Sequence, residues 1–181
     1  MPFPDAVIVL PGISGSVLAK DGKEIWGTSG GVIWRAISSG GDSIKSLALT
    51  AVDDPKIDDI GDGVTATGLI QDVHIIPGLW KIDGYSGLIE RLRSALGLEP
   101  GKNLFEFAYD WRRDNRVSAR CLQHLSHDWL KSWRSQSSNG DAKLILVAVT
   151  HISPAKLICW VCGRHHGTRL LVKFWHRSAR R

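Results

Sequence analysis

Residues 6–16 read AVIVLPGISGS, and this stretch decides the expected fold. The run from 6 to 10 is short, apolar and mostly β-branched, which predicts a fully buried strand. Pro11 and Gly12 follow at once and predict a tight turn where the strand ends. Gly12 and Gly15 let the backbone turn sharply, so amide N–H groups there can hold an oxyanion or a phosphate. The simpler alternative is an ordinary glycine turn after a strand.

Helical and strand patterns alternate after residue 84. We predict a helix over 85–97, a strand over 103–109, a second helix capped by Asp114 or Asn115 and ended by residues 137–140, and a strand over 143–149. The apolar stripes of these helices are Leu88, Ile89, Leu92 and Leu96 in the first and Leu122, Leu125, Trp129 and Trp133 in the second. This order predicts right-handed crossovers and a parallel α/β sheet, whose ligands bind beyond the carboxyl ends of the strands.

The segment from about residue 20 to 84 has a different character. It is rich in glycine and serine, with an acidic run at 53–62 and only brief apolar segments, so we expect an irregular insertion. Another polar cluster follows the second predicted strand, where residues 109–113 read YDWRR. Either Asp110 takes part in catalysis, or it pairs locally with Arg112 or Arg113 while Trp111 packs.

Composition excludes several classes of protein. The 181 residues are 43% hydrophobic and 23% charged, which is typical of a globular domain and not of a disordered, collagenous or disulfide-dense chain. No run approaches the roughly 18 apolar residues of a membrane span, and residues 1–12 lack a signal-type segment. Three cysteines argue against an oxidised secreted scaffold, so we expect a cytoplasmic location.

Six segments between about residues 5 and 148 resemble one known family. In chain order they are VIVLPGISGSVL, IWG, GLIQDV, IPGLWKIDGYSGLIERL, NLFEFAYDWRRDNRVSA and KLILVA. Together they resemble the lecithin:cholesterol acyltransferase family, a branch of the α/β-hydrolase fold. The most specific elements are the strand followed by PG-x-x-GS and the YDWR motif.

The resemblance implies acyl chemistry on a lipid ester, without a metal or cofactor. In that family a serine on a strand-to-helix elbow attacks the acyl carbonyl, an aspartate-supported histidine takes its proton, and backbone amides stabilise the oxyanion. Ile13 matches the position whose amide N–H helps form the oxyanion hole. The resemblance also places Gly12 and Ser14 at the substrate, and Trp26, Trp34 and Trp80 in a lid-like region over the acyl site. For the tryptophans, core filling is the alternative.

The chain departs from the family after KLILVA. The family continues with histidine, serine, methionine and two glycines, whereas this chain reads Val149-Thr150-His151-Ile152-Ser153. Thr150 aligns with the nucleophile and Ser153 is the nearest hydroxyl, but neither has the small flanking residues that a nucleophile elbow needs. The acid and base of the family lie in a stretch farther on that has no counterpart here. We therefore expect catalysis to be impaired.

Residues 149–181 form a basic tail in which we expect a replaced terminus, as a frameshift would produce. The first 150 residues hold 16 Lys and Arg and all 18 Asp and Glu, whereas residues 151–181 hold seven Lys and Arg and no acidic residue. The tail contains zinc-ligand types at Cys159, Cys162, His165 and His166. Chance clustering accounts for their close spacing, so no metal site is expected. One interpretation of the basic residues is a contact with nucleic acid or an anionic membrane. The alternative is a solvated tail, and we expect no nucleic-acid partner.

These observations predict an incomplete α/β-hydrolase-like domain over 1–148, with a lid-like insertion at about 20–84, followed by a divergent tail. The expected function is lipid O-acyl transfer or ester hydrolysis through a serine-type mechanism. The partner is then a lipid or acyl-ester substrate, with a peripheral contact to a lipid surface. The alternative is a non-catalytic lipid- or partner-binding module on the same fold.

Overall fold

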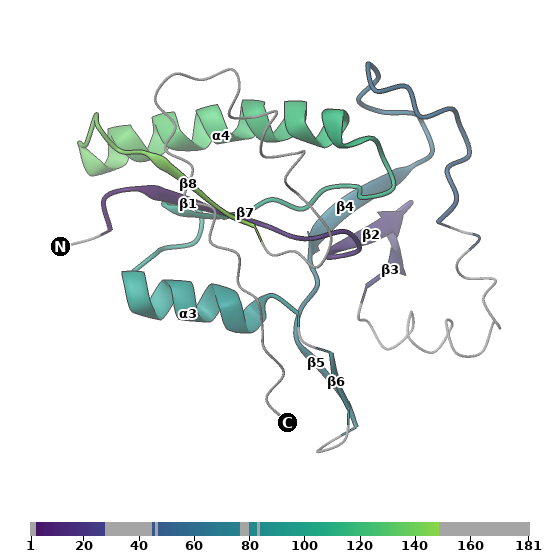
Figure 1. Ribbon diagram of the computed structural model, residues 1–181, viewed down its shortest axis with the longest axis horizontal. Coiled ribbons are helices and arrows are strands. Elements are labelled where there is room, and N and C mark those ends of the chain that lie inside the picture. Colours follow the sequence, from purple (N-terminus) through teal and green to yellow (C-terminus); the bar gives the residue numbers. More distant parts are fainter. Residues whose placement is uncertain (1–2, 28–44, 46, 77–79, 83, 149–181) are drawn as a thin grey trace.

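A parallel three-stranded sheet lies at the centre of the molecule (Figure 1). The computed structural model describes residues 3–27, 45, 47–76, 80–82 and 84–148. The sheet consists of β1 (Ala6–Leu10), β7 (Leu104–Glu106) and β8 (Leu144–Ala148), in the order β7-β1-β8. Both pairings of β1 are parallel. The prediction of a parallel α/β sheet is therefore confirmed, although β7 is shorter than the strand expected over 103–109.

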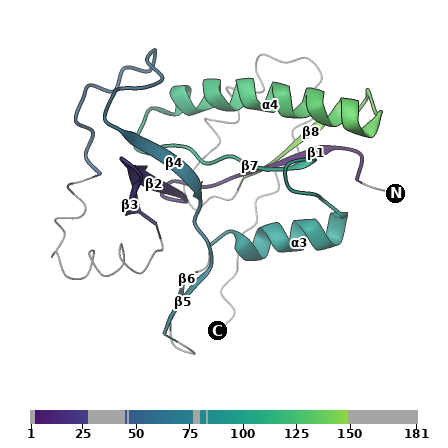
Figure 2. The same cartoon turned by 180° about the vertical axis from the view of Figure 1, so that it is seen from behind.

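Two helices cover opposite faces of this sheet, as both views show (Figures 1 and 2). The chain passes from β1 to β7 through α3 (Ser86–Leu96) and then to β8 through α4 (Asn115–Ser137). Because β7 and β8 lie on opposite sides of β1, right-handed crossovers place their helices on opposite faces. The chain therefore adds β7 on one side of β1 and then β8 on the other side. The position between β1 and β8, where this reversal occurs, is where α/β folds bind their ligands.

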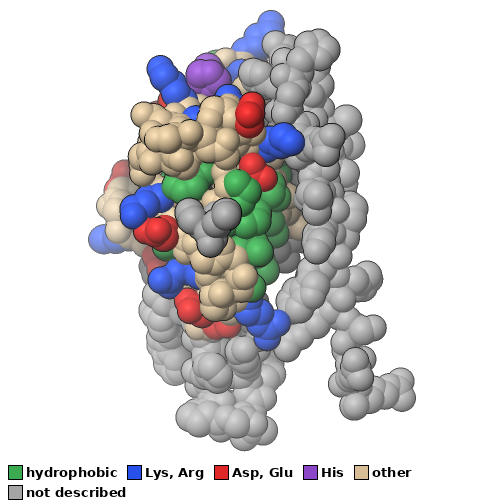
Figure 3. Space-filling model, turned by 90° about the vertical axis from the view of Figure 1, so that its left-hand side faces the viewer, with side chains coloured by type: hydrophobic (Ala, Val, Ile, Leu, Met, Phe, Trp, Pro, Cys, Tyr) green, Lys and Arg blue, Asp and Glu red, His purple; other side chains and the backbone are tan. Residues whose placement is uncertain are grey.

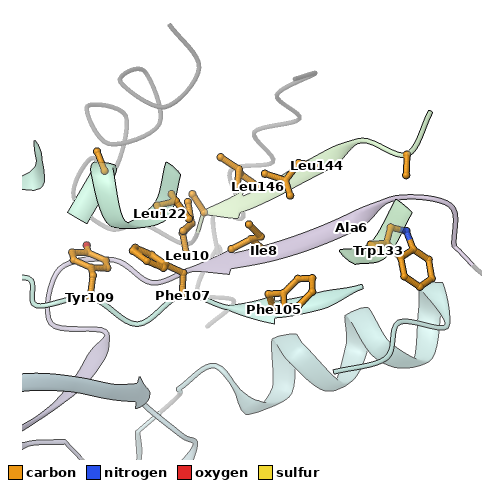
Figure 4. Close-up of a cluster of buried hydrophobic side chains, with 13 residues drawn as sticks. Ala6, Ile8, Leu10, Phe105, Phe107, Tyr109, Leu122, Trp133, Leu144 and Leu146 are labelled. Carbon is orange, nitrogen blue, oxygen red and sulfur yellow. The ribbon is translucent and has the colours of Figure 1, made fainter. Parts of the chain in front are cut away.

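Side chains of β1 alternate between two hydrophobic clusters. Ala6, Ile8 and Leu10 pack on the α4 side, whereas Val7 and Val9 pack on the α3 side. On the α4 side they meet Leu122 and Trp133, which the sequence placed on the apolar face of this helix (Figure 4). Because both faces of the sheet are covered, a run without polar residues is the sequence expected for β1.

The helix ends follow local sequence signals. The Asp114 side chain accepts a hydrogen bond from the Arg116 N–H at 2.8 Å and caps α4, as predicted. Gly97 ends α3 in the left-handed conformation, with φ of 63°. The predicted apolar stripe of α3 packs against the cluster on its side of the sheet except at Leu96, whose residue surface is 38% exposed. The helix ends at this residue, and Leu98 beyond the turn is buried instead.

The expectation of an irregular insertion over about 20–84 is wrong at four short strands, whereas residues 47–63 are irregular as expected. An antiparallel sheet in the order β3-β2-β4 contains β2 (Ser16–Lys20), β3 (Lys23–Trp26) and β4 (Val64–Leu69). A second antiparallel pair joins β5 (Val73–Ile76) to β6 (Trp80–Ile82). Asp21 and Gly22 have φ of 49° and 77°, as in the type I′ turn that suits a two-residue hairpin. This Asp-Gly pair is the sequence signal for the β2-β3 hairpin.

The end of the molecule at which the parallel strands begin has a mixed surface. Figure 3 shows basic and acidic side chains interspersed around a smaller hydrophobic area on its described part. None of the helices that the structure describes combines the length and the hydrophobicity needed to cross a lipid bilayer.

Candidate functional site

Residues 11–16, here called the β1 loop, contain a tight turn at the carboxyl end of β1. The Gly15 N–H donates a hydrogen bond to the Gly12 carbonyl oxygen at 3.0 Å, which closes a four-residue turn. Ser14, third in the turn, has a φ of 63°, whereas Ile13 before it does not have a positive φ. This combination is typical of a type II turn, in which glycine or asparagine usually holds the third position. A serine there costs roughly 1–2 kcal/mol of backbone strain.

The α3 side of the β1 loop is fixed by Tyr85, the residue immediately before that helix. The Gly12 N–H donates a hydrogen bond to the Tyr85 hydroxyl oxygen at 2.9 Å. The Tyr85 N–H donates to the Ile70 carbonyl at 2.8 Å, and the Ile70 N–H donates to the Gly15 carbonyl at 3.0 Å. A side chain at Gly15 would collide with the Tyr85 hydroxyl and would lie 2.9 Å from the Pro11 Cβ atom. Glycine is therefore required at position 15.

The opposite side of the loop is fixed by two tryptophans. The Trp26 indole N–H donates to the Ser14 carbonyl at 2.9 Å, and the Trp111 indole N–H donates to the Ser16 carbonyl at 3.3 Å. The two indole rings meet edge to face with centroids 5.3 Å apart. The fully buried Ser16 hydroxyl accepts a hydrogen bond from the Tyr109 N–H at 3.0 Å. The loop is thus connected both to the antiparallel sheet and to the segment after β7.

Ile13 lies at the exposed position of this fixed loop. Its residue surface is 50% exposed, and no described residue accepts a hydrogen bond from its amide N–H. A fixed amide without an internal acceptor can donate to an anionic oxygen without rearranging the protein. The neighbouring Gly12 amide differs, because its N–H already donates to Tyr85.

The chain's two tyrosines both lie near the loop and stay protonated at neutral pH. Burial raises the pKa of Tyr85, although the hydrogen bond from Gly12 opposes that shift. Burial and the nearby Tyr85 together raise the pKa of Tyr109 to about 12. The Tyr85 hydroxyl therefore remains a neutral hydrogen-bond donor as well as an acceptor.

Asp110 and the two arginines of the YDWRR motif form ion pairs. Arg112, with only 3% of its side chain exposed, contacts Asp110 at 2.6 Å and Asp62 at 2.7 Å. The hydrogen bond to Asp110 raises the pKa of the Arg112 guanidinium, which stays charged. Trp111 packs against Trp26. The alternative of local pairing by Asp110 with packing by Trp111 is therefore confirmed.

Arg113 holds the acidic run at 53–62 against the start of α4. Its guanidinium donates to the Asp53 carboxylate at 2.8 Å and to the carbonyl oxygens of Ile57 and Asp58 at 2.7 and 3.0 Å. The Asp53 carboxylate also accepts from the Asp114 N–H at 2.7 Å. These contacts explain the acidic run as a structural partner of the arginines. Within the described part of the chain, no group of His, Cys, Asp or Glu residues is arranged to hold a metal ion.

The structure brings four of the predicted site residues together: Gly12, Ile13, Ser14 and Trp26. Trp34, Thr150 and Ser153 lie outside the described residues, as do the tail residues Cys159, Cys162, His165 and His166. Trp80 begins β6, but its side chain is also outside the description. Ala148, the last described residue, pairs with Leu10, so the chain beyond β8 continues from a point beside the β1 loop.

Sequence reasoning missed Tyr85, Ser16 and the second role of Trp111. Their hydrogen bonds join residues that are 73, 93 and 95 positions apart, so no local motif reports them. The sequence feature that comes closest to indicating a role for Tyr85 is its position directly before an amphipathic helix.

No family model matches this chain, and no curated protein matches it.

Proposed function

We propose that this chain is a lipid acyltransferase or ester hydrolase of the lecithin:cholesterol acyltransferase type with impaired catalysis, built on an incomplete α/β-hydrolase-like fold. The observation that carries the proposal is the Ile13 amide N–H, which has no acceptor among the described residues and belongs to a half-exposed residue of the hydrogen-bonded loop at the carboxyl end of β1. An oxyanion hole needs such a donor, because negative charge develops on the acyl oxygen during attack on an ester.

The position of the loop in the sheet supports this proposal. The β1 loop begins beside Ala148, because Leu10 and Ala148 are register partners. Hydroxyl nucleophiles of α/β hydrolases follow a central strand, and an oxyanion-hole amide comes from a loop after a neighbouring strand. Thr150, two residues beyond Ala148, is the residue that the resemblance aligns with the nucleophile.

The chemistry of the loop surroundings suits an acyl ester more than a phosphate. The Ile13 side chain is apolar and half exposed. Arg112 and Arg113, the cations of the nearby YDWRR motif, are occupied by carboxylates and carbonyls. The region therefore offers the Ile13 amide donor next to an apolar side chain, which fits a carbonyl oxygen attached to a hydrocarbon chain.

The proposed step forms a bond between a hydroxyl oxygen and the acyl carbon. The carbonyl electron pair moves onto the acyl oxygen, which accepts a hydrogen bond from the Ile13 N–H. The attacking hydroxyl gives up its proton to solvent, the oxyanion electron pair re-forms the carbonyl as the alkoxide departs, and the alkoxide takes up a proton from solvent. The product is an acyl-enzyme, which water or an acceptor alcohol cleaves. Thr150 and Ser153 are the hydroxyls proposed for attack. If neither reacts, the same amide binds the carboxylate of a fatty acid in a non-catalytic lipid-binding module.

Two substitutions at one position test the oxyanion role of Ile13. Ile13→Pro deletes the amide N–H at the second position of the turn, where proline is favoured in type II turns. Ile13→Ala keeps the amide and removes most of the side chain. With p-nitrophenyl decanoate as substrate, we expect Ile13→Pro to lower kcat by about 100-fold or more, and Ile13→Ala to change mainly KM.

The same assay identifies the nucleophile and the alternative function. Loss of turnover in Thr150→Ala or Ser153→Ala assigns the attacking hydroxyl, whereas unchanged turnover in both rejects these two residues. Equal kcat in Ile13→Pro and the wild type would overturn the oxyanion role. If the wild type binds decanoate without turnover and Ile13→Pro weakens that binding, the protein is a lipid-binding module. Absence of both turnover and binding would contradict either function.

A further inference from the structure

The Tyr85 side chain has a hydrogen-bonding capacity that the fold does not use. Its hydroxyl oxygen accepts the hydrogen bond from the Gly12 N–H at 2.9 Å. A phenol can accept and donate at the same time. No described residue accepts a hydrogen bond from the Tyr85 hydroxyl, so its proton remains available. The Gly12 amide fixes the position of the oxygen, and the proton must point elsewhere.

The free Tyr85 proton lies within a short distance of the free Ile13 amide. Gly12 and Ile13 are adjacent, and consecutive Cα atoms are about 3.8 Å apart, which limits adjacent amide nitrogens to less than that spacing. With the 2.9 Å hydrogen bond at Gly12, the Tyr85 oxygen and the Ile13 nitrogen are at most about 7 Å apart. Two hydrogen bonds of about 2.9 Å to the oxygens of one carboxylate, phosphonate or tetrahedral intermediate can span this separation.

The loop keeps this pair of donors in place. The Tyr85 N–H donates a hydrogen bond to the Ile70 carbonyl, and the Ile70 N–H donates one to the Gly15 carbonyl. These two backbone hydrogen bonds hold Tyr85 next to the turn. The absence of a side chain at Gly15 leaves the space that the hydroxyl occupies. Burial favours the protonated phenol, which is the form that donates.

We propose that the Tyr85 hydroxyl is the second hydrogen-bond donor of the anion site, acting with the Ile13 amide on the oxygens of one acyl-derived anion. This inference rests on the proposed function, since it assigns a further donor to the same site. It specifies the ligand as an anion with a hydrocarbon chain and two accessible oxygens. Tyr85 thereby contacts the ligand itself, in addition to holding the Gly12 amide.

The two tyrosines of this chain allow a direct test by NMR. Protein labelled with 13C at tyrosine Cζ gives two resonances, and Tyr109→Phe assigns them by removing one. Decylphosphonate serves as the probe, and 15N resonances report the Ile13 amide in the same titration. We expect the Tyr85 Cζ and Ile13 amide resonances to shift together, because both groups donate to the added anion. A purely structural Tyr85 would keep its Cζ resonance.

Affinity for decylphosphonate supplies the second readout. Tyr85→Phe should bind about tenfold more weakly than the wild type, as expected for loss of one hydrogen bond to a charged group. Tyr109→Phe is the matched control, because the Tyr85 hydroxyl accepts a hydrogen bond from the β1 loop, whereas the Tyr109 hydroxyl makes no hydrogen bond with a described residue. It should bind like the wild type. If Tyr85→Phe does not fold, the Cζ shift in the wild-type protein still decides the question.

The outcomes separate this inference from the proposed function. If the Ile13 amide shifts while Tyr85 Cζ stays unchanged and Tyr85→Phe binds normally, the donor role of Tyr85 is overturned and the Ile13 site stands. If neither resonance responds and no binding is measured, the anion site itself is absent, which overturns both proposals.

Discussion

The indole N–H of Trp26 donates a hydrogen bond to the carbonyl oxygen of Ser14 at 2.9 Å. Trp26 ends β3 in the antiparallel sheet, whereas Ser14 follows β1 of the parallel sheet. The bond therefore joins the two sheets at the residue whose φ of 63° shapes the β1 loop. The tryptophan that the resemblance places in a lid-like region is thus hydrogen-bonded to the proposed oxyanion loop.

Trp26→Phe tests this connection. Phenylalanine keeps an aromatic ring beside Trp111 but removes the N–H, so we expect the free energy of unfolding to fall by about 1 kcal/mol. The turn should also open more often, which hydrogen exchange of the Gly15 amide measures. Trp129→Phe is the control, because Trp129 stacks on Phe105 at 4.6 Å in the α4 cluster. Equal exchange of Gly15 in both variants would contradict a special role for Trp26.

Gly15→Ala tests how closely Tyr85 packs against the turn. The added methyl group would meet the Tyr85 hydroxyl, lie 2.9 Å from the Pro11 Cβ and 3.0 Å from the Gly12 oxygen. We expect a loss of about 2 kcal/mol in unfolding free energy, as overpacking typically costs. Gly140→Ala is matched in chemistry but meets no atom within 4 Å, so its stability should change little. Urea denaturation of both variants measures the difference, and equal midpoints would contradict the close packing.

The parallel half of the fold was predictable because its signals are local. The apolar run of β1, the capping residue Asp114 and the glycine at position 97 each specify one element through neighbouring residues. Leu96 lies on the predicted stripe but is exposed, because α3 ends at this residue and periodicity alone does not show where a stripe stops contacting the sheet. The strands at 16–26 were missed although the Asp21-Gly22 pair is a known hairpin signal.

The candidate site was only half predictable. Ile13 was found through the glycines around it and through the resemblance, both of which are readable along the chain. Tyr85 reaches Gly12 across 73 residues, and this contact depends on how α3 packs below the sheet. Arg113 binds Asp53 across 60 residues, so the sequence suggested the nearby Asp110 as a partner and did not connect Arg113 with the acidic run. Long-range hydrogen bonds of this kind follow from topology and leave no periodic pattern.

Arg113→Lys tests whether the acidic run is held by a planar guanidinium. Lysine keeps the charge but cannot contact Asp53, Ile57 and Asp58 together. Its three N–H donors are all on one nitrogen, whereas those of arginine are spread over a planar guanidinium. The Arg113 side chain is only 6% exposed, so we expect unfolding free energy to fall by about 3 kcal/mol. Arg93→Lys is the control, since its pair with Glu90 is exposed and should contribute below about 0.5 kcal/mol. Trypsin cleavage after Lys56 should accelerate only in Arg113→Lys, and equal cleavage in both would contradict the clamp.

Asp114 makes the stability of α4 depend on pH. Hydrogen bonds from the Arg116 side chain and from its backbone N–H lower the pKa of Asp114 from 3.8 to about 2. The folded protein therefore binds this proton less readily than the unfolded chain does. The resulting stabilisation is fully present above the unfolded pKa of 3.8 and is lost as pH falls through the folded pKa of about 2.

Two substitutions separate the charge of Asp114 from its capping role. Asp114→Asn keeps an oxygen that accepts from the Arg116 N–H but removes the charge, so the wild type should be more stable near pH 7 and lose this advantage near pH 2. Asp114→Ala removes both and should cost about 1 kcal/mol more than Asp114→Asn near neutral pH. Urea denaturation across this pH range measures both differences. A gap between wild type and Asp114→Asn that does not change with pH would contradict the lowered pKa, because only a titrating carboxylate makes that gap close in acid.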